Sequence, residues 1–108
     1  MVQVANLSTF IRERVVNSKA GAEAREGKRY YTDRPLDGSV VEKLYRHATY
    51  LLQLYKILLE KDRNTDFGFL PDQNKRGLDR VRYGVYRELC DFGLEVLAKG
   101  FQDRYSPK

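Results

Sequence analysis

The chain has 108 residues, of which 42% are hydrophobic and 32% charged. It is therefore long enough for one domain with one core, and too hydrophobic for wholesale disorder. Lysine and arginine outnumber aspartate and glutamate by 20 to 15, giving a net charge of +5, which favours a polyanionic partner. The single cysteine excludes a disulfide framework and a cysteine-based zinc site. With no apolar run long enough to span a membrane and no signal-peptide pattern, we expect a cytoplasmic protein.

The first periodic segment predicts a helix over residues 7–17, with Asn6 as its N-cap. Apolar residues spaced three and four apart mark one face of this helix: Leu7, Phe10, Ile11 and Val15. Residues 18–38 contain three glycines, a proline and a charged tract. This composition predicts a long, mobile basic loop.

The second segment predicts a helix over residues 39–61. It begins with a candidate capping box, in which Ser39 and Glu42 satisfy backbone N–H groups of the first turn. An apolar seam for a partner helix follows: Val41, Leu44, Ala48, Leu51, Leu52, Tyr55, Leu58 and Leu59.

The third segment predicts a helix over residues 74–99, with Gly100 as its stop and 101–108 as a short tail. We assign its core stripe to Leu78, Val81, Val85, Leu89, Phe92 and Val96, with Tyr86, Cys90, Leu94 and Leu97 on an adjoining stripe. Gly77, Gly84 and Gly93 indicate either close helix crossing or a local break. The expected fold is all-α: a single domain, 1–108, forming a small antiparallel bundle of three main helices.

The sequence offers little for catalysis. His47 is the sole histidine, predicted on a solvated side of the second helix, and one histidine without further ligands makes no metal site. Cys90 lies between apolar positions, as expected of a buried small hydrophobic residue. We therefore expect a protein that is not an enzyme and has no metal or cofactor.

Positive charge is concentrated in the long loop and the third helix. Basic and acidic residues number seven and four in 1–36, five and five in 37–71, and eight and six in 72–108. Arginine can bind phosphate oxygens in a bidentate manner, and tyrosine can stack on a base. The predicted nucleic-acid-binding residues are therefore Arg76, Arg80, Arg82, Tyr83 and Arg87 on the helix, and Lys28, Arg29 and Tyr30 in the loop. The alternative is an ordinary solvated face, partly neutralised by acidic neighbours.

Eight tyrosines and no tryptophan also suggest contact with a partner. Tyr31, Tyr45 and Tyr50 lie outside the predicted seams and are candidate partner-binding residues. The leading hypothesis is a non-catalytic small subunit of a larger assembly that binds the backbone of RNA or single-stranded DNA. In size and charge alone, the chain resembles the small subunits of CRISPR effector complexes. The second hypothesis is a protein-interaction adaptor or chaperone that uses the exposed tyrosines or the seam of the second helix.

Overall fold

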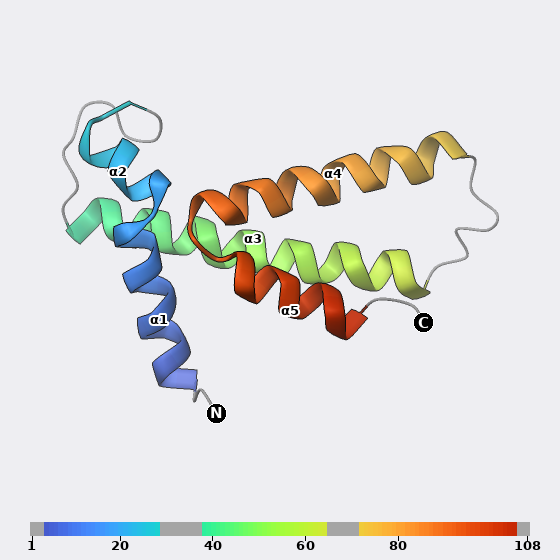
Figure 1. The fold of residues 1–108 in the computed structure, drawn as a ribbon, viewed down its shortest axis with the longest axis horizontal. Helices are drawn as coiled ribbons and strands as arrows, with labels where there is room; N and C mark the ends of the chain where they lie inside the picture. Colours follow the sequence, from blue (N-terminus) through green and yellow to red (C-terminus); the bar gives the residue numbers. More distant parts are fainter. Residues whose placement is uncertain (1–3, 29–37, 65–71, 106–108) are drawn as a thin grey trace.

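The computed structural model describes residues 4–28, 38–64 and 72–105, and this part of the chain is all-helical (Figure 1). The five helices are α1 (Val4–Asn17), α2 (Lys19–Arg25), α3 (Gly38–Asn64), α4 (Asp72–Asp91) and α5 (Glu95–Tyr105). The all-α prediction is confirmed, but the bundle of three main helices is not. Within the described residues, no helix is both long and apolar enough to cross a bilayer.

The long helix α3 lies at the centre of the molecule and contacts each of the other four helices. As Figure 1 shows, α4 runs back along α3 and α5 turns forward again, while α1 crosses α3 steeply near its start. The molecule measures 48 × 34 × 16 Å and has a radius of gyration of 15.7 Å. A compact domain of this length has a radius of gyration of about 13 Å, so the fold is a flat, elongated plate.

Residues 18–38 are not one long loop, because α2 occupies the first part of this segment. Ser18 is the N-cap of α2: its hydroxyl accepts from the Gly21 N–H at 3.0 Å and donates to the Val15 carbonyl at 2.7 Å. Three alanines in the helix favour helical backbone. Arg25 donates to the carbonyl of Val16 at 2.9 Å and so ties α2 to the end of α1.

Two predicted helix caps are wrong. The first helix begins at Val4, so Asn6 lies inside it, and α3 begins at Gly38, so Ser39 lies within its first turn. The carboxylate of Glu42 accepts hydrogen bonds from both terminal nitrogens of Arg12 on α1. This residue therefore links two helices and does not complete a capping box.

The predicted helix 74–99 is broken between α4 and α5, where Gly93 has a φ of +69°. The Leu94 N–H donates to the Leu89 carbonyl and the Gly93 N–H donates to the Cys90 carbonyl, at 3.0 and 2.9 Å. This pair of hydrogen bonds is the Schellman motif that ends α-helices. Of the two explanations for Gly93, the local break is therefore correct. The chain then continues as helix through Gly100 to Tyr105, so the predicted stop at Gly100 is wrong and residues 101–105 of the predicted tail belong to α5.

The predicted seam of α3 forms the middle of the core, since Leu44, Ala48 and Tyr55 are at most 3% exposed. The first helix contributes Ile11 and Val15 as expected. In the third segment the prediction fails at two positions: Val81 is 51% exposed and Val96 is 65% exposed. The break at Gly93 resets the helical phase, so that Leu94, just before α5, and Ala98 within α5 are buried in place of Val96.

Candidate nucleic-acid interface

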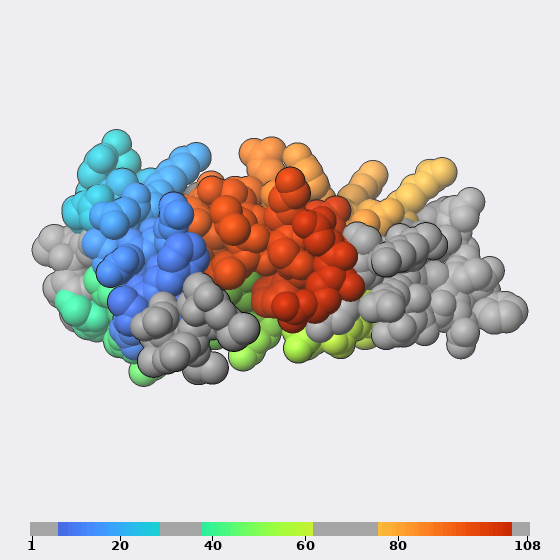
Figure 2. Space-filling view, turned by 60° about the horizontal axis from the view of Figure 1, so that its bottom comes forward, coloured from blue at the N-terminus to red at the C-terminus, as the bar shows by residue number. Residues whose placement is uncertain are grey.

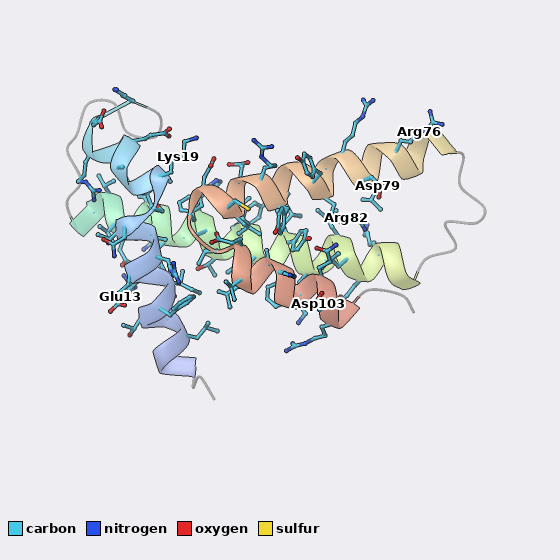
Figure 3. The ribbon with its side chains drawn as sticks, viewed as in Figure 1. Glu13, Lys19, Arg76, Asp79, Arg82 and Asp103 are labelled. Carbon is cyan, nitrogen blue, oxygen red and sulfur yellow. The ribbon has the colours of Figure 1, made fainter. Side chains whose placement is uncertain are left out.

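The outer face of α4 carries most of the predicted nucleic-acid-binding residues. Four of them lie on the solvent side of this helix: Arg76, Arg80, Tyr83 and Arg87. The opposite side buries Val85 and Leu89 in the core. Long side chains of α4 project from one edge of the molecule (Figure 2), and Arg76 points away from α3 (Figure 3). The spacing of three and four residues thus produces the exposed basic stripe that the sequence predicts.

Tyr83 and Arg87 form a pair on this stripe. The Nη1 of Arg87 donates to the Tyr83 hydroxyl at 3.2 Å, and its guanidinium carbon lies 5.8 Å from the centre of the tyrosine ring. This hydrogen bond raises the pKa of Arg87 above its usual value. The ring of Tyr83 is still 60% exposed, so a ligand can reach a flat aromatic surface beside a fixed positive charge.

Arg82 does not belong to the stripe. Its side chain is partly buried and donates from Nη2 to Oδ1 of Asp79 at 3.0 Å. Figure 3 shows both residues on the part of α4 that looks toward α3 and α5. Arg82 therefore lines an inner cleft and is not part of the outer face of α4.

This cleft has a volume of about 500 Å³ and lies between α3, α4 and α5. Its lining residues are Tyr55, Asp79, Arg82, Tyr83, Tyr86 and Gln102. The rings of Tyr55 and Tyr86 are tilted, with their centres 5.8 Å apart. Burial raises the pKa of both phenols, so both keep their hydrogen-bond donors at neutral pH.

The sequence does not predict the cleft. Its six residues come from three helices, and Gln102 falls in the segment expected to be a tail. Only the fold-back of α5 brings this residue beside Tyr55 and Tyr86. One signal in the sequence could have revealed the cleft. If Gly93 is taken as the end of a helix, Leu94 begins a new apolar face and the following segment can fold back.

The predicted loop residues do not join the stripe in the described structure. Lys28 follows α2 and pairs with Glu26 at 2.8 Å, and α2 lies at the opposite end of the molecule from the start of α4 (Figure 1). Arg29, Tyr30 and Tyr31 lie outside the described residues.

Of the two remaining candidate partner-binding tyrosines, only Tyr50 is exposed. Its side chain is 57% accessible on α3, in line with Ile57 two turns later. Tyr45 instead packs between α1 and α3: its hydroxyl lies 3.0 Å from Ser8 Oγ, and the guanidinium carbon of Arg12 lies 4.2 Å from its ring centre. Tyr45 is therefore partly buried against α1, and only Tyr50 remains an exposed candidate.

The two residues weighed for catalysis lie beside the core. His47 is not a simple surface residue, since its ring contacts Phe92 edge-on at 5.8 Å and its Nε2 is 3.6 Å from a Glu88 oxygen. Cys90 is partly buried, and burial raises the pKa of its thiol, so the thiol is protonated and weakly nucleophilic. No three metal-ligating side chains come together in the ranges 4–28, 38–64 and 72–105.

The chain matches no family model, no curated protein and no solved structure.

Proposed function

We propose that this protein is a non-catalytic nucleic-acid-binding subunit that holds the phosphate backbone of a single strand along α4. The observation that carries the proposal is the exposed stripe of Arg76, Arg80, Tyr83 and Arg87. The stripe spans twelve residues of helix, and its two ends lie about 16 Å apart, a length that passes several phosphates. Arginine contacts of this kind fix the backbone and do not read sequence.

The positions of the acidic residues on α4 support the proposal. A stripe of arginines is an ordinary solvated face if neighbouring carboxylates neutralise it. Here Asp79 pairs with Arg82 and Glu88 lies against His47. These two acidic side chains have partners outside the stripe, whereas Asp91 interacts electrostatically with Arg87 at the C-terminal end of the stripe and further raises the pKa of this arginine.

The test is fluorescence anisotropy of a labelled single strand titrated with the protein at several salt concentrations. Neutralising phosphates on a single strand gives a slope of log K against log salt of roughly −0.7 per contact, so three arginines predict a slope near −2. Reversing charge in the double variant Arg80→Glu, Arg87→Glu should weaken binding at least tenfold and flatten this slope, with an unchanged circular dichroism spectrum.

The matched control is Lys56→Glu with Lys61→Glu, which makes the same change in net charge at exposed positions of α3. If α4 is the binding face, this control should weaken binding much less than the α4 variant. Equal losses in the two variants would mean that only net charge matters, and the assignment to α4 would be wrong.

A second function, as a protein-interaction adaptor, is favoured by the exposed pair Tyr50 and Ile57 on one face of α3. The seam of α3 is not available for it, because the chain's own helices cover Leu44 and Leu51. Wild-type protein that fails to bind any strand at low salt would support the adaptor over nucleic-acid binding.

A further inference from the structure

The cleft between α3, α4 and α5 has aromatic walls. Tyr55 is 3% exposed and lies deep in the structure, Tyr86 is partly exposed, and Tyr83 stands at the solvent side. Flat rings of this kind bind planar ligands by stacking. Its volume of about 500 Å³ lies in the range of small-ligand sites.

The polar groups of the cleft indicate which planar ligand it takes. Asp79 offers a carboxylate that is 58% exposed, Arg82 a guanidinium that is 28% exposed, and Gln102 a carboxamide. Donors and acceptors therefore lie at the same rim. Asp79 and Arg82 form an ion pair with no net charge, so this pair offers no excess positive charge to a phosphate group. A neutral ring with a hydrogen-bonding edge fits these groups better than an anion does.

The cleft and the outer stripe share Tyr83. Its hydroxyl accepts from Arg87 on the stripe, while its side chain also lines the cleft. Asp79 is likewise next in sequence to Arg80. A strand whose phosphates lie along α4 thus passes the mouth of the cleft, close enough for one base to turn inward.

We propose that this cleft takes one unstacked nucleobase of the strand bound along α4, with its ring against the accessible tyrosines Tyr83 and Tyr86 and its edge at Asp79 and Arg82. The proposal rests on the proposed function and names the group that the strand inserts. Guanine fits best, because it offers N–H donors to a carboxylate and the O6 and N7 acceptors to a guanidinium.

The test compares two labelled single strands of about 12 nucleotides, a length suited to a small binding module. The first strand consists of thymidine except for a single guanosine at its centre. The second strand has the same number of phosphates but carries no bases. Wild type should bind the base-containing strand about 5- to 100-fold more tightly, the range expected for one stacked base. Tyr86→Leu should weaken binding to the base-containing strand about tenfold and leave binding to the abasic strand unchanged.

Two further variants distinguish recognition of the base from binding of the phosphate backbone. Asp79→Asn changes an exposed side chain and should abolish the preference for the guanosine strand over one made of thymidine alone. Arg76→Ala is the backbone control: it should weaken the guanosine and abasic strands by the same factor. Thermal unfolding followed by circular dichroism checks that each variant remains folded.

The outcomes distinguish this proposal from the proposed function. If wild type binds the guanosine and abasic strands equally, or if Tyr86→Leu weakens both alike, the base site is wrong while backbone binding along α4 stands. If wild type binds neither strand at low salt, the proposed function fails and the base site fails with it.

Discussion

At Gly21 the backbone approaches the end of α1 so closely that a side chain has no room. A Cβ atom placed there would lie 2.4 Å from the Val15 carbonyl oxygen and 2.6 Å from that of Val16. Both atoms belong to backbone, which cannot rotate away as a side chain can. At Gly84, in contrast, a Cβ would meet no heavy atom within 4 Å. Replacing these two helical glycines with alanine should therefore change stability in opposite directions.

We expect Gly21→Ala to destabilise the protein by about 2–3 kcal/mol, because α2 must move away from α1. The matched control Gly84→Ala should stabilise it by about 0.5–1 kcal/mol, the ordinary gain of alanine over glycine in a helix. Urea unfolding followed by circular dichroism measures both. If Gly21→Ala is as stable as wild type, the close contact between α1 and α2 does not exist.

The Arg12–Glu42 pair makes stability depend on pH. Its hydrogen bonds from Arg12 lower the pKa of Glu42 below its usual value of 4.5. A carboxyl with a depressed pKa in the folded state contributes stability that is complete above the pKa of the unfolded chain. This contribution disappears as the pH falls through the folded pKa, which lies below 4.5.

We therefore expect Glu42→Gln to lower stability at neutral pH and to reduce the loss of stability between about pH 5 and pH 3. Urea midpoints over this pH range provide the measurement. Glu60→Gln is the control, because it removes the same charge from the same helix. A wild-type slope retained in Glu42→Gln would contradict the role of the pair.

At the scale of elements, two glycines end helices in the same way. Gly27 and Gly93 both have a φ of +69°. After α2, the Lys28 N–H donates to the Glu23 carbonyl and the Gly27 N–H to the Ala24 carbonyl, which repeats the Schellman pattern that ends α4. The second of these motifs decides the architecture, because it turns one long periodic segment into the pair α4 and α5.

Replacing Gly93 tests this turn. A Cβ there would meet only Arg14 side-chain atoms, the nearest at 3.6 Å, so Gly93→Ala suffers from its backbone conformation and not from a clash. We expect a loss of about 1–2 kcal/mol, and a smaller loss in Gly93→Asn, since asparagine tolerates this conformation better. Calorimetric or urea unfolding would show the order glycine, asparagine, alanine. Equal stability of all three would exclude a left-handed residue at this position.

Sequence periodicity predicts the helices well where one element buries one face. The seam of α3 and the α1 face with Ile11 and Val15 are both found in the core. The prediction from periodicity is wrong at Val96. The apolar spacing continues through Gly93, so the sequence pattern does not show that one helix ends there and the next begins with a different buried face.

The sequence predicts the part of the candidate site that lies on a single helix, but not the part that is built from several helices. The outer stripe lies on one helix, so its spacing alone places Arg76, Arg80 and Arg87 together. The inner cleft combines residues from three helices, and its existence depends on the tertiary fold. Arg82 shows the difference: by its spacing it only flanks the stripe, and the tertiary fold places it with Asp79 at the cleft.

At the scale of the whole molecule, the plate extends only 16 Å along its shortest axis, against 48 Å along its longest. Much of the surface of each helix therefore remains accessible. The stripe of α4 and the Tyr50–Ile57 face of α3 are two such surfaces. A thin plate can therefore expose a charged and an apolar surface together.

The central position of α3 also determines how the chain can acquire its structure. Without α3, the pairs α1–α2 and α4–α5 would be joined to each other by only a few contacts. During synthesis, α1 and α2 leave the ribosome before α3 does, and their apolar side chains stay uncovered until residue 64 has emerged. Folding thus waits for the middle of the chain and is then cooperative. The amide hydrogens of α3 should accordingly be the last to exchange with solvent.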